Sequence, residues 1–137
     1  MPILDQVIER NKDTVKLVFK NYPLTNHRYS RKAAAAALAA DTKGKYLEFQ
    51  EALFKNMRKL SDEKVREIAA SLGLDADEIE KEMNSKKIQK MISQDIKDAN
   101  EAGIRGTPTI FINGIQLKNR SLQGFQDIIN SQLKKRP

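Results

Sequence analysis

Apolar residues recur at every third or fourth position over most of the chain, which is the spacing of an amphipathic helix. Segment 2–10 begins this pattern, and Pro2 suits the first turn of a helix there. The apolar stripe of this helix starts at Ile3, and no capping residue precedes it. Either the helix begins abruptly, or the chain begins in the middle of a helix.

Segment 15–20 has a different period. Val15, Leu17 and Phe19 alternate with two lysines and Val18, which predicts a strand with one covered face. Lysines on the other face suit the edge of a sheet, because charge there discourages pairing with other chains.

Between residues 25 and 103 the helical spacing returns and is divided by glycines. We expect a succession of helices whose ends are set by capping residues and by glycine. The expected caps are Asn26 or Ser30, Ser61, Asp75 with Glu78, and Ser85, and the expected stops are Gly44, Gly73 and Gly103. The positions expected to face inward are Tyr46, Phe49, Leu53, Met57, Val65, Ile68, Leu72, Ile88, Met91, Ile92, Ile96, Ala99 and Ala102. We interpret these stripes as helical core rather than as a ligand groove.

Two short apolar segments near the C-terminus predict a β-hairpin. Segments 109–112 and 115–118 are separated by Asn113-Gly114, the pair that type I′ turns prefer. Ser121 is then expected to cap a last helix. The inward residues of that helix are Phe125, Ile128, Ile129 and Leu133. The order helix, strand, helical block, hairpin, helix predicts an α/β fold in which helices flank a small sheet.

Pro108 stands directly before the first strand of this hairpin. Proline lacks the N–H that a sheet uses, and it is tolerated as the first residue of a strand. The alternative is a cis bond between Thr107 and Pro108, a geometry that is uncommon even before proline. The residues alone leave both interpretations open.

Composition restricts the chemistry of the chain. Its 137 residues favour one domain, and a content of 39% hydrophobic and 31% charged residues is typical of a globular protein. No apolar run reaches the length of a membrane span, and the acidic Asp5 and Glu9 are not typical of a signal peptide. The sequence has no cysteine and one histidine, His27, which excludes thiol chemistry and a Cys/His metal site. We expect no metal and no cofactor.

The formal net charge of +7 suits an anionic partner. The basic residues are mixed with Asp and Glu along the chain, as in segments 61–67 and 75–82, and such mixtures are typical of solvated helix faces. Specific nucleic-acid binding requires a patterned basic patch, so we do not expect it here.

The remaining polar residues carry little chemistry. His27 is expected to form a hydrogen bond at a helix start, because the chain offers no nucleophile for it to activate. The carboxylate pairs Glu48/Glu51 and Asp95/Asp98 lie on polar helix faces and are interpreted as solvated surface rather than as an acid–base site.

Several segments in this order resemble a known family. They are "VKLVFKNYPL", "NHRYSRKAAAAALAA", "GKYLEFQEALF", "AGIRGTPTIFINGI" and "LQGFQDIINSQLK", which together span nearly the whole chain. The order and spacing resemble the bacterial DsbA-like thiol–disulfide oxidoreductases, which have a thioredoxin-like fold with a helical insertion. The resemblance implies one domain over residues 1–137, with a core of 1–24 and 104–137 and an all-helical insert of 25–103.

The resemblance also implies a function for the segment around Pro108. In the family a cis-proline loop lies beside the redox site and contacts the substrate peptide, so the bond from Thr107 to Pro108 is expected to be cis. The expected substrate-binding residues are Thr107, Pro108, Gly106 and Arg105, and the expected partners are proteins or peptides. The family implies a periplasmic or other extracytoplasmic location.

The sequence departs from the family at its chemistry. Family members carry Cys-x-x-Cys at the N-terminus of the first core helix, where the helix dipole stabilises a thiolate. Pro2 resembles a residue just after that motif, so we expect a chain truncated at its N-terminus that lacks the motif and the strand before it. This chain would then be the redox-inactive C-terminal portion of a disulfide oxidoreductase.

Two alternatives stay open. The chain could be a thioredoxin-like binding or scaffold module that works without thiols, or an unrelated basic module that binds nucleic acid or protein. A Cys-x-x-Cys encoded upstream of Met1 favours the oxidoreductase, a native start at Met1 favours the binding module, and salt-sensitive retention on nucleic acid favours the third hypothesis.

The resemblance has a consequence for assembly. In the family, the strand that this chain lacks lies between the strands expected at 15–20 and 109–112. Two inner edges would then lack partners, and apolar edges recruit other chains. We therefore expect self-association, most simply as a two-fold homodimer.

Overall fold

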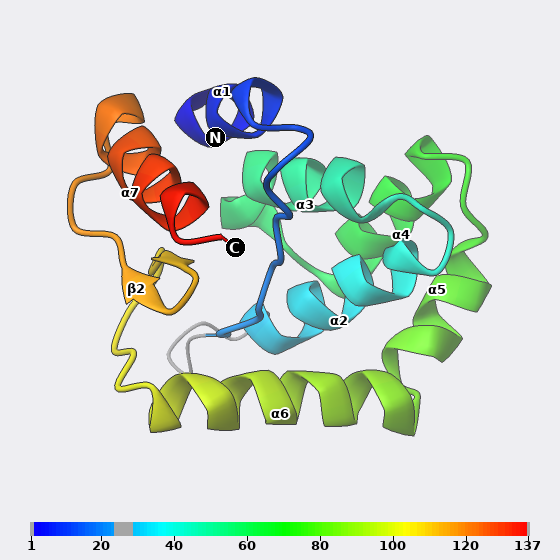
Figure 1. Cartoon of the computed structure of the whole chain (residues 1–137). Coiled ribbons are helices and arrows are strands. Elements are labelled where there is room, and N and C mark those ends of the chain that lie inside the picture. The colour runs from blue at the N-terminus through cyan, green and yellow to red at the C-terminus, as the bar shows by residue number, and fades with distance from the viewer. Residues whose placement is uncertain (1, 24–28, 137) are drawn as a thin grey trace. The chain divides into compact units, whose positions relative to one another are not determined.

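The computed structural model describes residues 2–23 and 29–136, which form seven α-helices, one short 3-10 helix and a two-stranded sheet (Figure 1). The chain divides into two compact units. We call Met1–Lys20 with Ile104–Pro137 the terminal unit and Asn21–Gly103 the helical unit. The assignment of both to one domain stays a prediction, and the roles expected for Asn26 and His27 lie outside the described residues.

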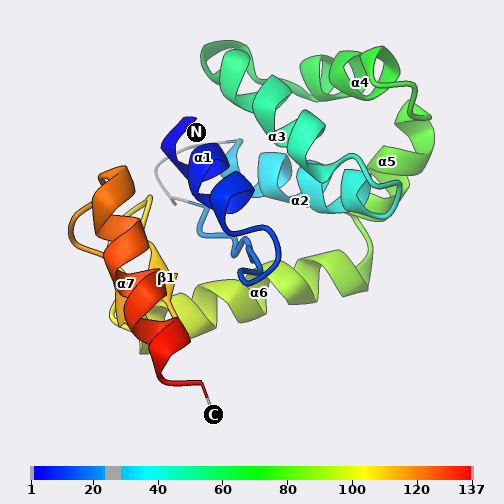
Figure 2. The same cartoon turned by 45° about the horizontal axis from the view of Figure 1, so that its top comes forward.

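The terminal unit joins the two ends of the chain around a hairpin. It contains α1 (Pro2–Arg10), β1 (Phe111–Ile112), β2 (Ile115–Gln116) and α7 (Leu122–Lys134). Helices α1 and α7 lie side by side in both views (Figures 1 and 2). Their apolar faces enclose a small core whose buried members are Val7, Leu117, Phe125 and Ile129. The predicted inward face of the last helix is therefore correct at its centre, while Ile128 and Leu133 are half-buried at its margin.

A pair of side-chain amides joins α1 to α7. Asn11 is 7% exposed, and its Nδ2 donates to the Val7 carbonyl at 2.8 Å and to Gln126 Oε1 at 3.0 Å. Gln126 Nε2 donates in return to Asn11 Oδ1 at 3.1 Å. A buried side-chain amide without hydrogen-bond partners costs free energy. The reciprocal bonds therefore favour the one relative position of the two helices in which both amides are paired.

The hairpin has the turn that its sequence predicts. Asn113 and Gly114 both have positive φ angles, 49° and 81°, as a type I′ turn requires. The strands are shorter than predicted, with Phe111 opposite Gln116 and Ile112 opposite Ile115. One further bond, from the Leu117 amide to the Ile110 carbonyl at 2.8 Å, extends the pairing toward Pro108.

The strand predicted over residues 15–20 is wrong, because this segment has no regular secondary structure. Alternation supplies an apolar face, but a strand also needs a neighbouring strand for its backbone groups. In the described residues β1 and β2 pair only with each other. Leu17, Val18 and Phe19 are consequently left 39%, 60% and 41% exposed.

The helical unit is a cluster of helices around α2. Its elements are α2 (Ser30–Asp41), α3 (Tyr46–Lys55), the 3-10 helix η1 (Met57–Lys59), α4 (Asp62–Ser71), α5 (Ala76–Met83) and α6 (Lys86–Glu101). Helix α2 contacts α3, α4, α5 and α6, and Figure 2 shows it between α3 and α6. Five alanines of α2 are no more than 2% exposed, namely Ala35, Ala36, Ala37, Ala39 and Ala40. Because alanine ends at Cβ, the other helices can approach α2 on several sides.

Most of the predicted helix ends are confirmed. The hydroxyls of Ser61 and Ser85 accept hydrogen bonds from the amides of Lys64 and Ile88, and the Asp75 carboxylate accepts from two amides of α5. Gly44, Gly73 and Gly103 all have positive φ angles, as expected where a helix stops. The exception is α2, where Tyr29 occupies the cap position and Ser30 is the first helical residue.

Some positions expected to be buried are exposed. Met57 is 63% exposed because α3 ends at Lys55 and the following 3-10 helix breaks the helical spacing. Met91 is 41% exposed because it lies at the edge of the apolar stripe of α6, whose centre is Ile88 and Ile92. Ala102 is also exposed, at the C-terminal cap of α6, and Leu72 is half-buried.

Asp95 is not the solvated carboxylate that its helix face predicted. Its Oδ2 accepts from the backbone amide of Asn21 at 2.9 Å and from Asn21 Nδ2 at 3.0 Å. Asp95 is half-buried, and Asn21 is 8% exposed. These bonds attach the beginning of the helical unit to the middle of its last helix. Glu51, by contrast, is the surface residue expected, in an ion pair with Lys55 at 2.9 Å.

Candidate functional site

The loop before the hairpin contains the residues singled out in the sequence. Arg105, Gly106, Thr107 and Pro108 are consecutive and all are exposed. The peptide bond between Thr107 and Pro108 is cis, which decides between the two interpretations of Pro108. We call residues 105–108 the proline loop. Its exposed backbone leads directly into the half-buried residues Thr109 and Ile110.

Two hydrogen bonds connect the proline loop to its surroundings. The Thr109 hydroxyl donates to the Gly106 carbonyl at 2.6 Å, across the cis bond. Arg120 Nη2 donates to the Pro108 carbonyl at 2.9 Å, from the far end of the hairpin. The loop is therefore held from both sides although it lies at the surface.

Arg120 was not identified from the sequence. It lies between the hairpin and α7, where the Ser121 amide donates to Asn119 Oδ1 at 3.1 Å and the Gly124 amide donates to the Ser121 hydroxyl at 3.1 Å. Gly124 is buried against Asn119, and a Cβ on Gly124 would overlap the Asn119 backbone oxygen. This close approach sets the path of the chain through Arg120. Sequence spacing gives no sign that residues 108 and 120 meet.

The surroundings of the proline loop in the sequence are cationic. Between Glu101 and Asp127 the chain has three charged side chains, Arg105, Lys118 and Arg120, and no carboxylate. The whole chain, by comparison, mixes 25 basic with 18 acidic residues. The segment that carries the loop and the hairpin thus has an excess of positive charge.

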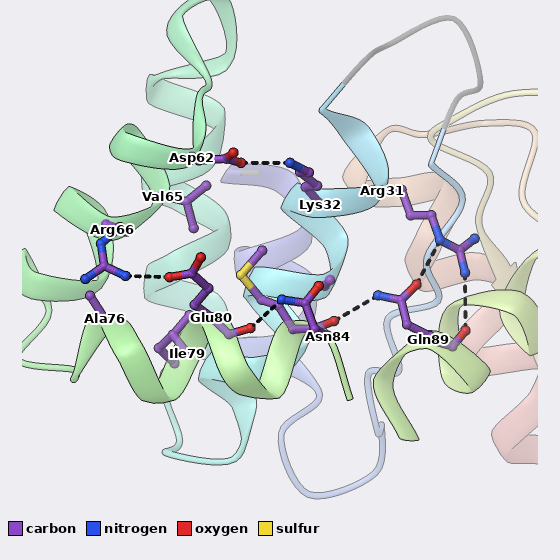
Figure 3. Close-up of a pocket in the computed structure, with 12 residues that line it drawn as sticks. Arg31, Lys32, Asp62, Val65, Arg66, Ala76, Ile79, Glu80, Asn84 and Gln89 are labelled. Atoms are coloured by element: carbon purple, nitrogen blue, oxygen red, sulfur yellow. Dashed lines mark hydrogen bonds and ion pairs between the residues drawn. The ribbon is translucent and has the colours of Figure 1, made fainter. Parts of the chain in front are cut away.

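The helical unit has a pocket of its own, drawn in Figure 3. Its volume is about 220 Å³, and its apolar wall is formed by Ala35, Val65, Ala76, Ile79 and Met83. That volume is below the range of about 300–1,000 Å³ usual for small-molecule sites.

The charged rim of this pocket is largely neutralised by pairing. Lys32 Nζ lies 2.9 Å from Asp62 Oδ1, and Arg66 lies 2.6 Å from Glu80 (Figure 3). Arg66 also lies 2.7 Å from Asp77. The carboxylates of Asp77 and Glu80 raise the pKa of the Arg66 guanidinium. We therefore interpret the pocket as a groove between packed helices, bridged by surface ion pairs.

Tyr46, on α3 of the helical unit, also has a shifted pKa. Burial raises the pKa of the Tyr46 phenol, and the negative charges of Asp41 and Asp95 raise it further. A raised pKa keeps the phenol neutral at physiological pH, so Tyr46 is not a candidate base.

Two properties of the described parts of the chain bear on function. Among these residues no group of three or more His, Cys, Asp or Glu side chains could hold a metal ion. No described helix is long and apolar enough to cross a membrane.

The sequence profile of the family described as thioredoxin matches residues 2–131. The chain belongs to the thioredoxin family.

The chain spans very different shares of two proteins that are similar to it in sequence. The chain is 32% identical over 102 residues to a Na⁺/H⁺ antiporter, NhaA 3, of Salinispora tropica, and this match covers 74% of the chain and 16% of the antiporter. It is 26% identical over 133 residues to the probable disulfide bond formation protein D of Bacillus cereus, covering 91% of the chain and 61% of that protein. The chain thus spans about a sixth of the antiporter and about three-fifths of the disulfide protein.

Solved structures agree on the thioredoxin-like fold. A thioredoxin-like oxidoreductase from Silicibacter pomeroyi superposes with a TM-score of 0.83 at 26% identity, covering 99% of this chain and 78% of that one. The DsbA of Proteus mirabilis, solved with a non-covalently bound peptide, superposes with a TM-score of 0.75 at 19% identity. The match covers 96% of this chain and 78% of that one. The fold is therefore that of DsbA-like thioredoxin oxidoreductases, in a chain without cysteine.

The contact between Gly124 and Asn119 leads to a prediction. Replacing Gly124→Ala places a methyl group where the Asn119 backbone oxygen lies, so α7 or the segment through Arg120 must shift. We expect the free energy of unfolding to fall by about 1–3 kcal/mol, as in other overpacked sites. Denaturant titration followed by circular dichroism measures it. The control is Ser131→Ala on the exposed side of α7, expected within about 0.5 kcal/mol of wild type. Equal stability of the two variants would contradict the close approach.

Proposed function

We propose that this chain is the peptide-binding portion of a DsbA-like thiol–disulfide exchange protein, and that it does not itself exchange disulfides. The observation that carries the proposal is the exposed proline loop, held by hydrogen bonds directly before the hairpin of a thioredoxin-like fold. Arg105, Gly106, Thr107 and Pro108 are the residues proposed to meet the peptide.

The backbone of the proline loop supports this proposal. An extended peptide binds a protein edge through main-chain hydrogen bonds, which requires exposed amide and carbonyl groups held in a fixed position. Residues 105–108 are exposed, and bonds from Thr109 and Arg120 hold the carbonyls of Gly106 and Pro108. A braced loop loses little conformational entropy when a peptide binds.

The lack of sulfur nucleophiles supports the second half of the proposal. Disulfide exchange begins with the attack of a thiolate on a disulfide sulfur. The chain has no cysteine, and its sulfur is confined to four methionines. Any exchange at this site must therefore use thiols that are not among these 137 residues.

The second candidate is a thioredoxin-like binding or scaffold module that works without thiols. The absence of cysteine favours this module too. The module would also bind its partner through the proline loop. The nucleotide sequence upstream of the Met1 codon separates the two, since an in-frame Cys-x-x-Cys belongs only to the exchange protein. For the exchange protein we propose a periplasmic or other extracytoplasmic location.

Peptide binding is the experiment that tests the proposal. We expect the chain to bind a fluorescent peptide, PWATSDS, which is the peptide of the Proteus mirabilis complex with its cysteine changed to serine. Thr107→Tyr should weaken binding about three- to tenfold, because it covers one or two main-chain hydrogen-bonding groups. Fluorescence anisotropy measures the affinity. Thr42→Tyr, at an exposed threonine of the helical unit, is the matched control and should bind like wild type. No binding by wild type, or equal loss in both variants, contradicts the proposal.

Redox silence is a second expectation. The purified chain should neither reduce insulin nor oxidise a reduced dithiol peptide above the rate of buffer, because it has no thiolate to start the exchange. Turbidity of the insulin B chain and thiol titration of the peptide measure these rates. Turnover that persists in a preparation free of contaminating thiol proteins would refute this.

Self-association is a third expectation. Leu17, Val18 and Phe19 form an exposed apolar run outside any strand, and such runs promote contacts between chains. We propose a two-fold homodimer in which these segments meet. Sedimentation velocity over a range of concentrations should show a dimer, and Val18→Lys should shift it toward monomer. Val18→Thr keeps the β-branched shape and is the control. A wild-type monomer at the highest concentration rules the dimer out.

A further inference from the structure

We propose that Arg120 makes the proline loop selective for acidic peptides. This inference rests on the proposed function, since it names the class of peptide that the loop prefers. The starting point is the bond from Arg120 Nη2 to the Pro108 carbonyl at 2.9 Å. It holds a permanent positive charge next to the loop, because a guanidinium stays protonated in proteins.

The hydrogen-bonding capacity of Arg120 is only partly used. A guanidinium has five N–H donors in a planar fork. Among the residues that the structure describes, the Pro108 carbonyl is the one acceptor recorded for it. Arg66 in the helical unit makes a useful contrast, because Asp77 and Glu80 both pair with it. Arg120 therefore keeps donors that a peptide carboxylate could accept.

The local charge strengthens this effect. Arg105 belongs to the proline loop itself, and Lys118 precedes Arg120 by two residues. No carboxylate occurs in the sequence between Glu101 and Asp127 to offset these three charges. A peptide that pairs with the backbone at Thr107 lies one residue from the carbonyl that Arg120 holds. An Asp or Glu on that peptide is then attracted, and a Lys or Arg is repelled.

Arg120 thus has two roles that can be separated by substitution. It positions the Pro108 carbonyl through one N–H donor, and it supplies charge. Arg120→Gln keeps an N–H donor but removes the charge, whereas Arg120→Lys keeps the charge but loses the planar fork. The ratio of affinities for an acidic and a neutral peptide reports the charge alone.

The test uses the full 137-residue chain and two blocked peptides, PWATSDS and its neutral form PWATSNS. We expect wild type to prefer the acidic peptide about two- to fivefold at low salt, the range of an exposed ion pair. The ratio of the two affinities should fall toward one at about 0.5 M NaCl, where such charges are screened. Arg120→Gln should lose the preference, whatever its affinity for the neutral peptide, while Arg120→Lys should keep it.

Lys12→Gln is the matched control, because it removes one exposed positive charge of the terminal unit away from the proline loop in the sequence. Its preference for the acidic peptide should equal that of wild type. If wild type binds both peptides equally, the acidic selectivity is wrong and the proposed function stands. If Arg120→Gln lowers the affinity for both peptides equally and keeps their ratio, Arg120 only positions the loop. The proposed selectivity for acidic peptides is then also wrong. If wild type binds neither peptide, both proposals fail.

Discussion

The packing of α1 against α7 is the contact on which the terminal unit depends. These helices lie at opposite ends of the sequence, and the reciprocal amide bonds of Asn11 and Gln126 hold them together. The core of Val7, Leu117, Phe125 and Ile129 forms only when both are present. The chain must therefore close a loop that contains the whole helical unit, and contacts of such long separation slow folding.

The proline loop owes its position to this packing. Helix α7 closes the core with Phe125 and Ile129, and its first turn approaches Asn119 closely at Gly124. Arg120 lies inside that short connection and reaches back to the Pro108 carbonyl. The site is thus an exposed backbone segment held by elements that are themselves fixed by a buried core, which is how rigid scaffolds commonly present binding loops.

Local signals in the sequence predicted local structure well, and contacts between distant residues less well. The Asn113-Gly114 turn and the caps Ser61 and Ser85 are confirmed because each acts within a few residues. Segment 15–20 failed as a strand because a strand depends on a partner that its own alternation cannot reveal. Arg120 was missed for the same reason, since its contact with the proline loop follows from the path of the whole hairpin and not from spacing.

The bonds between Asn21 and Asp95 have a consequence for the architecture of related proteins. They attach the entry of the helical unit to α6 only six residues before that helix ends at Glu101, a distance of about 9 Å along its axis. Entry and exit of the unit therefore lie near one another, as in domains that tolerate insertion into a host. The helical unit thus has the close ends expected of a segment inserted between two parts of another domain.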